Sequence, residues 1–226
     1  MCSFDAVFID FYGTVSAGDR QAVHDACATL VQAFRLAMTP GELAVHWGER
    51  FFQAVDRSNH EAFRSLYECE CSSLLDTLRP VVGDFDPAPY VAPLEDYWRD
   101  PPLHDDAADF LAGLSLPVCC VSNADAGPLA AAIAKHGLRF DAVVSSQDAR
   151  CYKPANGIFR RAAEALDVRP SRVLHVGDSL HSDIGGAAKL GITTAWVCRS
   201  ERIHDIGTVA ADHTVSSLRQ IPALLG

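Results

Sequence analysis

The sequence predicts an α/β fold, in which a parallel sheet carries helices on both faces and an all-helical insertion follows the first strand. Two patterns lead to this prediction. Over residues 104–197, short apolar runs alternate with segments of helical periodicity, which is typical of parallel strands joined by right-handed crossovers. Residues 19–79 show helical periodicity alone, so they interrupt the sheet after its first strand.

The first predicted strand covers residues 6–11 and contains a carboxylate, Asp10, near its end. The other residues of this run are apolar, and Gly13 supplies the flexible turn that follows. The carboxyl end of a strand is where open α/β sheets place their ligands. Asp10 is therefore a candidate catalytic residue, although a carboxylate that only caps a turn fits this stretch equally well.

The insertion is predicted to contain three amphipathic helices. Thr39, Pro40 and Glu42 form a capping box, with proline at the first helical position, at the start of the second helix. Apolar residues recur at helical spacing in each of the three segments, which cover residues 19–38, 40–55 and 63–78.

Six of the twelve prolines fall within residues 80–102, a composition that predicts a linker leading back to the sheet. We therefore assign residues 1–15 and 100–226 to the core that contains the sheet. Residues 16–99 form the helical insertion, including its proline-rich return linker.

The C-terminal half supplies the remaining strands and the helices that cover them. Apolar runs predict strands over residues 116–121, 142–145, 173–176 and 193–197. Helices fit between them, over residues 104–114, 126–136, 155–167 and 182–190. Gly137 and Gly191 lie where a glycine is expected to end a helix. His175 falls within a strand and is expected to be a hydrogen-bonded core residue.

Charge and composition exclude several classes of function. A formal net charge of −10 argues against binding to nucleic acids or to an anionic membrane surface. The apolar runs are far shorter than the roughly 20 residues that span a bilayer. A strand that begins near residue 5 leaves no room for a secretory signal, so we expect a cytoplasmic location and reduced thiols for the eight cysteines. The oligomeric state does not follow from the sequence.

Polar residues follow several of the predicted strands, where they would meet at one edge of the sheet. Taken singly, each has an ordinary explanation as a helix cap, a turn residue or a solvated charge. Three carboxylates gathered in one crevice repel one another, and a hard cation such as Mg²⁺ would remove that repulsion. The set comprises Asp10, Ser122, Asn123, Lys153, Asp178 and Asp183.

These residues carry a resemblance to a known family. The ordered segments Asp10-Phe-Tyr-Gly-Thr14, Ser122-Asn123, Lys153-Pro154 and Gly177-Asp178-Ser-Leu-His-Ser-Asp183 resemble the four motifs of the haloacid dehalogenase superfamily. The resemblance implies a Rossmann-like core, a helical cap, and a covalent mechanism in which Asp10 attacks the substrate. In the phosphatase branch it further implies that Mg²⁺ is held by Asp10, the backbone carbonyl of Tyr12 and Asp178, with Asp183 orienting the metal's water ligands. Thr14, Ser122, Asn123 and Lys153 would bind the phosphoryl group, with Tyr12 beside the substrate.

Tyr12 departs from the phosphatase pattern, because most phosphatases of the superfamily carry a second aspartate there as the general acid. The form Asp-x-Tyr-Gly-Thr resembles instead the branch that hydrolyses 2-haloacids without a metal. Asp178 and Asp183 favour the phosphatase branch. We therefore expect a Mg²⁺-dependent phosphatase that acts on a small phosphorylated metabolite through an aspartyl-phosphate. The alternatives are a metal-independent 2-haloacid dehalogenase that uses an aspartyl ester on a halogenated substrate, and a catalytically weak homologue that binds a phosphometabolite.

Overall fold

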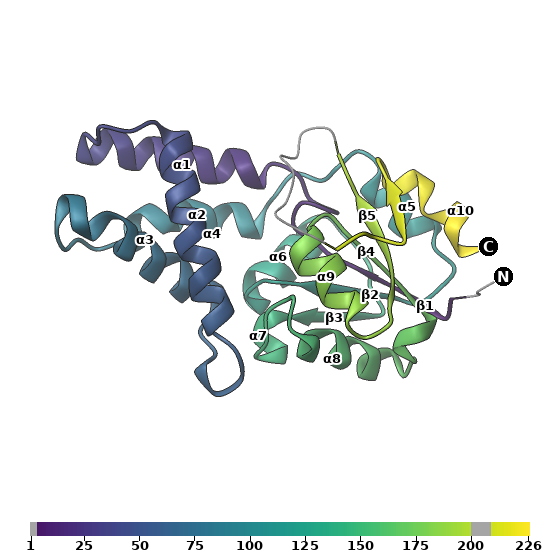
Figure 1. Ribbon diagram of the computed structural model, residues 1–226. Helices are drawn as coiled ribbons and strands as arrows, with labels where there is room; N and C mark the ends of the chain where they lie inside the picture. Colours follow the sequence, from purple (N-terminus) through teal and green to yellow (C-terminus); the bar gives the residue numbers. More distant parts are fainter. Residues whose placement is uncertain (1–3, 200–208) are drawn as a thin grey trace.

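The central strand of the molecule is β1 (Ala6–Ile9), whose two neighbours come from distant parts of the chain (Figure 1). The structure is a computed structural model that describes residues 4–199 and 209–226, so Cys2 lies outside the described residues. Six parallel strands form one sheet in the order β3-β2-β1-β4-β5-β6. The strands after β1 are β2 (Val118–Ser122), β3 (Ala142–Ser145), β4 (Val173–Gly177), β5 (Thr193–Val197) and β6 (His213–Val215).

The predicted α/β fold is confirmed, and one strand adds to it. The sequence pattern did not predict β6, because its three residues include a histidine and a threonine and form no apolar run. It pairs with β5 at the edge of the sheet.

Helices cover both faces of the sheet, which explains why the central strands are apolar throughout. In β1 the side chains of Val7 and Ile9 pack into one apolar cluster and those of Ala6 and Phe8 into another, as the twofold period of a strand requires. The first cluster includes residues of α5 (Ala107–Gly113) and α6 (Ala126–Lys135), and α10 (Pro222–Leu225) packs against it. The second includes residues of α8 (Asn156–Leu166) and α9 (Gly185–Ala188), and the short α7 (Ser146–Ala149) follows β3.

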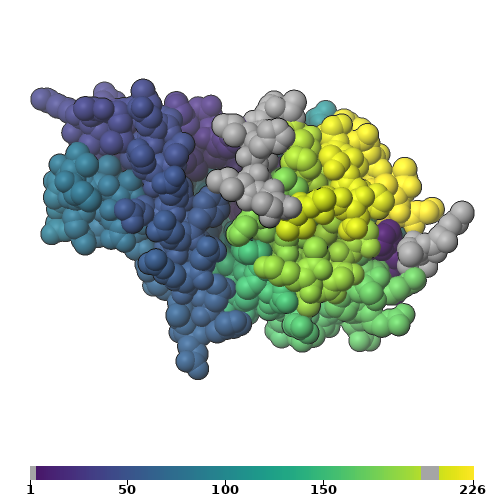
Figure 2. All heavy atoms as spheres, viewed as in Figure 1, coloured from purple at the N-terminus to yellow at the C-terminus, as the bar shows by residue number. Residues whose placement is uncertain are grey.

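Four helices between β1 and α5 form a second body, which we call the helical segment (residues 19–99). They are α1 (Asp19–Phe34), α2 (Pro40–Arg57), α3 (Leu66–Val82) and α4 (Ala88–Arg99). The predicted capping box at Thr39 and Glu42 is present. The segment has an apolar core of its own that includes Leu30, Trp47 and Leu74. It lies on the side of the sheet away from the N-terminus, as a separate lobe (Figures 1 and 2).

The prediction that residues 80–102 form only a linker is wrong. Pro80 lies inside α3, and residues 88–99 form α4, with Pro93 in its interior. Pro89 is tolerated because it stands in the first turn, where its missing N–H has no intrahelical partner. Val91 and Leu94 of α4 are buried in the core of the helical segment, and this burial offsets the cost of the internal proline.

The helical segment leaves and rejoins the sheet at one place. The backbone N–H of Ala17 donates to the carbonyl of Pro102 at 2.8 Å, and that of His104 donates to the carbonyl of Val15 at 3.0 Å. The two connections therefore run side by side, close to the carboxyl end of β1. Among the described residues, no helix is both long and apolar enough to cross a membrane.

Candidate active site

Asp10 lies directly after β1, between the carboxyl ends of the two neighbouring strands. Parallel pairing places Ile9 beside Cys120 of β2 and Val176 of β4, and the backbone N–H of Asp10 donates to the carbonyl of Val176 at 2.9 Å. Ser122 ends β2, and Asp178 follows β4 directly. The sheet thus brings residues that are more than a hundred positions apart to one edge.

Lys153 joins two of the predicted carboxylates. Its Nζ lies 2.6 Å from Oδ1 of Asp10 and 2.6 Å from Oδ1 of Asp183, and it also donates to the carbonyl of Val121 at 3.0 Å. The side chain is only 3% exposed. Three acceptors match the three N–H groups of an ammonium, so this buried charge is fully hydrogen-bonded.

Asp183 is held by more donors than the lysine alone. Its Oδ1 also lies 3.0 Å from Nε2 of His175, and its Oδ2 accepts from the backbone N–H of Ser179 at 3.1 Å. The expectation of a hydrogen-bonded core histidine is confirmed at Nε2, while the buried Nδ1 has no partner among the described residues. The sequence did not indicate that its partner would be a site residue. His175 therefore helps to fix the position of Asp183.

Two glycines of the motifs give the carboxylates the space they occupy. Gly13 has a φ of 89°, and a Cβ built on it would overlap the carboxylate of Asp178. A Cβ on Gly177 would overlap the carboxylate of Asp183. Any larger residue at either position would displace a carboxylate, which explains why glycine stands at both places.

Hydroxyl groups connect the carboxylates. Oγ1 of Thr14 lies 3.1 Å from Oδ2 of Asp10 and 3.2 Å from Oδ1 of Asp178, so it bridges the two side chains. Oγ of Ser122 lies 3.4 Å from Oδ1 of Asp10. Both residues therefore contact the candidate nucleophile, while their contact with a substrate stays a prediction.

Asn123 contacts Lys153 through the backbone. Its Nδ2 donates to the carbonyl of Lys153 at 3.1 Å, and its Oδ1 accepts from the N–H of the same residue at 2.7 Å. This double hydrogen bond fixes the loop that carries the lysine. The predicted role of Asn123 in binding the substrate stays untested beside this positioning role.

Burial and neighbouring charges shift the pKa values of the cluster in different directions. Burial raises the pKa of Asp10, against the opposing effect of Lys153. Burial also acts to raise the pKa of Asp183, but Lys153 and His175 outweigh it and lower that pKa to about 2. For Lys153, burial acts to lower the pKa, and the two carboxylates more than offset it, so the net direction is upward. An ammonium between carboxylates is therefore the stable arrangement.

Tyr12 does not supply the proton donor that an aspartate would supply at this position. Its hydroxyl donates to the backbone carbonyl of Trp98 at 2.6 Å, and its ring packs edge-on against Phe11 and Trp98. Burial raises the pKa of the phenol well above its ordinary value. The side chain thus anchors α4 to the loop after β1 and is not available as an acid.

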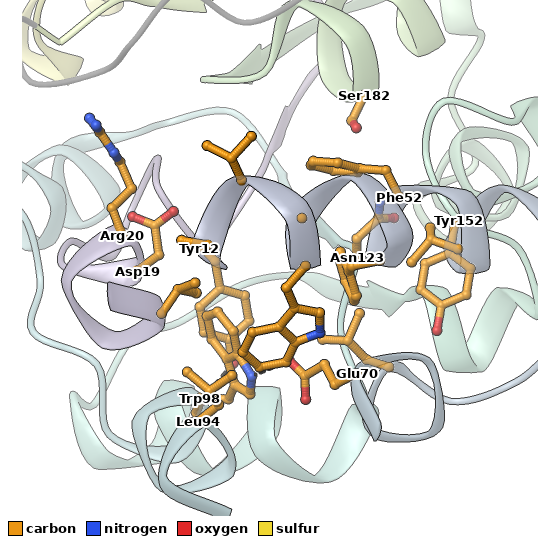
Figure 3. A pocket seen from close by; sticks show the side chains of 18 of the residues that line it. Tyr12, Asp19, Arg20, Phe52, Glu70, Leu94, Trp98, Asn123, Tyr152 and Ser182 are labelled. Atoms are coloured by element: carbon orange, nitrogen blue, oxygen red, sulfur yellow. Dashed lines mark hydrogen bonds between the residues drawn. The ribbon is translucent and has the colours of Figure 1, made fainter. Parts of the chain in front are cut away.

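A cavity of about 710 Å³ lies between the carboxylate cluster and the helical segment. Figure 3 shows side chains from both parts of the molecule around it, with Asn123 and Tyr152 from the core, and Glu70, Leu94 and Trp98 from the helical segment. Aromatic and aliphatic side chains make up half of the residues that line it, and most of the others are charged or polar. Tyr12, Asn123, Lys153, His181 and Ser182 mark the end that adjoins the predicted catalytic residues.

The sequence did not indicate the residues that the helical segment contributes to this cavity. Glu70 is 3% exposed and accepts a hydrogen bond from Nε1 of Trp98 at 2.9 Å. A usable signal was present, because Glu70 is the one charged residue on the buried face of α3, between Cys69 and Leu74. The aromatic residues of the cavity follow ordinary helical spacing, so sequence alone could not separate them from core residues.

The carboxylate cluster suits a hard divalent cation. Oxygen atoms of Asp10, Asp178 and Asp183 all lie within 4.8 Å of one another. Three carboxylates against one ammonium leave a surplus of two negative charges, which equals the charge of Mg²⁺ in magnitude. Carboxylate oxygens are also the protein ligands that Mg²⁺ prefers. The residues present therefore fit the metal that the sequence predicts.

Fold and site together define a hydrolase of the α/β class that carries a candidate nucleophilic aspartate at the central strand. The family model described as haloacid dehalogenase-like hydrolase matches residues 4–191. The chain belongs to this family.

Similar proteins include members with different activities. N-acylneuraminate-9-phosphatase of Mus musculus is 36% identical over 87 residues, which are 38% of this chain and 35% of that protein. (S)-2-haloacid dehalogenase 4A of Burkholderia cepacia is 26% identical over 99% of this chain and 94% of that protein. The structure of L-2-haloacid dehalogenase from Xanthobacter autotrophicus has a TM-score of 0.78 at 25% identity and covers 98% of both chains. The match to the phosphatase thus spans about a third of that protein's length.

Proposed function

We propose that this hydrolase is a Mg²⁺-dependent phosphatase that acts on a small phosphorylated metabolite through an aspartyl-phosphate on Asp10. The observation that carries the proposal is the convergence of Asp10, Asp178 and Asp183, with a surplus of two negative charges beside Lys153. A dehalogenase that works without a metal has little use for Asp178 packed against Gly13. The similarity to N-acylneuraminate-9-phosphatase supports the same reading.

The reaction would proceed in two steps. A carboxylate oxygen of Asp10 attacks phosphorus, the bond to the ester oxygen breaks, and the leaving alcohol takes a proton from solvent. Water then attacks phosphorus, and the bond between phosphorus and Asp10 breaks to release inorganic phosphate. Lys153, Ser122 and Thr14 contact Asp10, and in our proposal they stabilise the oxygens of the transferred group. When bound by Asp10, the carbonyl of Tyr12 and Asp178, with Asp183 orienting its water ligands, Mg²⁺ would supply charge neutralisation.

The helical segment would serve as a cap over this site. It lies at the carboxyl ends of the strands, and its residues form one wall of the cavity beside Lys153. The paired connections near Ala17 and Pro102 would allow it to move as one body.

The seven cysteines within the described residues are all free thiols, which supports a cytoplasmic location.

The tyrosine at position 12 leads us to expect a preference for particular leaving groups. Position 12 has no carboxyl group that could protonate the leaving oxygen. The hydroxyl of Tyr12 does not replace it, because it donates its hydrogen to the backbone carbonyl of Trp98. Loss of a general acid typically costs about 10²- to 10⁴-fold in rate. Aryl or acyl phosphates need less protonation than alkyl phosphates, so we expect faster turnover of the former. Equal turnover of both classes, with no gain for Tyr12→Asp on the alkyl ester, would contradict this expectation.

A second candidate function is metal-independent hydrolysis of a 2-haloacid. Two observations favour it: the tyrosine at position 12, and the similarity to haloacid dehalogenases over nearly the full length of the chain. In that reaction Asp10 would displace halide from carbon and form an ester, and a halide needs no proton to leave.

One pair of assays separates the candidates. Phosphate release from an aryl phosphate and chloride release from 2-chloropropionate are measured with Mg²⁺ and with EDTA. Our proposal expects phosphate release that EDTA abolishes. Chloride release that resists EDTA would overturn it. Neither activity, combined with tight binding of a phosphorylated metabolite, would favour a catalytically weak homologue.

A further inference from the structure

Glu70 of α3 is a buried carboxyl group in the wall of the cavity, and the reaction proposed above does not use it. Its Oε1 accepts from Nε1 of Trp98 at 2.9 Å. Its Oε2 is buried and has no hydrogen-bond partner within the part of the chain that the structure describes. A buried oxygen without a partner typically costs about 1–3 kcal/mol. Such an atom in a cavity wall indicates a place where a ligand can bind.

The surroundings of Glu70 favour its neutral form. Burial raises its pKa to about 8, against the opposing hydrogen bond from Trp98, and the carboxylates of Glu95 on α4 and Asp125 before α6 act in the same direction as burial. Since Trp98 donates to Oε1, the proton of the neutral acid belongs on Oε2. Glu70 therefore presents an O–H donor, and it requires an acceptor oxygen on the ligand.

Apolar side chains supply about half of the residues that line the cavity, and they favour a ligand with an apolar body. Trp47, Phe51 and Leu94 contribute to the lining, and so do Val45 and Phe52, which remain 61% and 60% exposed. Apolar side chains that stay exposed beside a cavity are typical of ligand sites. Figure 3 shows Glu70 on the opposite side of the cavity from Ser182, which lies within the motif that contains Asp178 and Asp183.

We propose that Glu70 is a specificity-determining residue that donates an Oε2–H hydrogen bond to an oxygen acceptor on a leaving group with an apolar body. This inference rests on the proposed function and deepens it. The substrate class is a phosphate monoester of an aromatic or similarly apolar alcohol that carries a carbonyl, ether or hydroxyl oxygen for Glu70 to bind.

The test uses binding rather than turnover, so that it succeeds or fails independently of the phosphatase assay. Two phenols of similar shape serve as probes of the cavity: 4-hydroxyacetophenone, which carries a ketone oxygen, and 4-isopropylphenol, which does not. Their dissociation constants are measured at pH 6.5 through the fluorescence of the tryptophans, two of which line the cavity. The informative quantity is the ratio of the two constants, because it cancels general changes in packing.

Two substitutions at one position distinguish a neutral donor from a charge. Glu70→Gln keeps an acceptor for Trp98 and an N–H donor in place of the O–H, so the ratio should stay within about threefold of that of the wild type. Glu70→Met keeps the length but removes the donor, so the preference for the ketone should fall by about tenfold, the usual worth of one buried hydrogen bond. Glu95→Gln, on the neighbouring helix, is the matched control and should leave the ratio unchanged. Melting curves verify that each variant folds.

Three results would overturn the proposal. The first is an unchanged ratio in Glu70→Met. The second is an equal loss in Glu70→Gln and Glu70→Met, accompanied by tighter binding of 4-hydroxyphenyl-trimethylammonium than of the ketone, since that pattern belongs to an ionised carboxylate that recognises a cation. The third is the absence of measurable binding of either phenol to the wild-type protein. Phosphatase activity in the presence of any of these results would leave the proposed function standing.

Discussion

Asn123 and Lys153 exchange two hydrogen bonds, in which the side-chain amide of the first pairs with both the N–H and the carbonyl of the second. The asparagine thus acts on the backbone of Lys153, while the ammonium of the lysine lies between Asp10 and Asp183. Removal of the Asn123 amide should therefore shift the ammonium of Lys153, although the amide bonds only to the backbone of that lysine.

The first prediction concerns this pair. Asn123→Ala should reduce kcat for an aryl phosphate by about 10- to 100-fold, because a shift of about 1 Å in a catalytic group can cost about 10²-fold. Steady-state kinetics with saturating Mg²⁺ measure the effect. Asn156→Ala, at the start of the next helix, is the control and should change kcat little. An Asn123→Ala enzyme with normal kcat would contradict the positioning role.

The second prediction concerns the buried ammonium. Lys153→Met should lower the free energy of unfolding by about 3–5 kcal/mol near pH 7, because it leaves the buried carboxylates of Asp10 and Asp183 without their cation. Urea unfolding measures the loss. Lys135→Met is the matched control: it breaks an exposed pair with Asp100, so the loss should be below about 1 kcal/mol. Similar losses in the two variants would show that the buried pairs contribute no more than a surface pair.

The third prediction separates metal binding from activity. Mg²⁺ should raise the melting temperature of the wild-type protein, since a ligand at 100 times its Kd stabilises the folded state by about 2.7 kcal/mol. Asp178→Asn should abolish most of this increase, because it removes one of the three carboxylates of the cluster. Asp105→Asn, which alters an exposed pair with Arg219, should keep it. A Mg²⁺ effect that survives in Asp178→Asn would place the metal elsewhere.

The fourth prediction follows from the raised pKa of Glu70. This pKa rises from 4.5 to about 8 on folding, so between these values the unfolded chain loses a proton that the folded protein keeps. The folded state therefore loses stability relative to the unfolded state as the pH rises through this window, by about 1.4 kcal/mol per pH unit. Glu70→Gln removes this dependence. The difference in unfolding free energy between variant and wild type should therefore increase in favour of the variant from pH 5 to pH 8.

Urea unfolding at several pH values tests that difference. Other titrating groups are common to both proteins and cancel when the two are compared. Glu61→Gln, at an exposed position, is the control for the substitution itself. A flat difference for Glu70→Gln would mean that its carboxyl is ionised in the folded protein at neutral pH.

The core could be predicted from the sequence because its signals are local and its topology is constrained. Each buried strand is a run of apolar residues, and parallel strands of one sheet place their carboxyl ends at the same edge. This is enough to bring Asp10, Ser122 and Asp178 together once the strands are located. Lys153 follows α7 and not a strand, so its predicted place beside them depends on the resemblance of its motif. The edge strand β6 escaped prediction because half-exposed residues such as His213 dilute the apolar signal.

The helical segment could be predicted only in part. Its first three helices follow from the spacing of apolar residues and from capping residues. Helix α4 was not predicted, because the prolines in its sequence indicate a linker more strongly than its apolar residues indicate a helix. The contacts of Asp125 illustrate what no local pattern contains. It stands before α6, yet its carboxylate accepts from the backbone N–H groups of Leu66 and Tyr67 at the start of α3. The cavity arises from such long-range packing, so its lining became visible only in the structure.

The central claim is that water attacks phosphorus on Asp10, and an isotope experiment tests it most directly. The enzyme is incubated with an aryl phosphate and Mg²⁺ in H₂¹⁸O, and mass spectrometry then follows the label in inorganic phosphate and in the peptide that contains Asp10. Our account predicts one ¹⁸O in the released phosphate, none in the carboxylate of Asp10, and no release with EDTA. Label in Asp10 after incubation with 2-chloropropionate, with no phosphate released from the aryl ester, would contradict it, because hydrolysis of a carbon ester at its carbonyl leaves the oxygen of water on the aspartate.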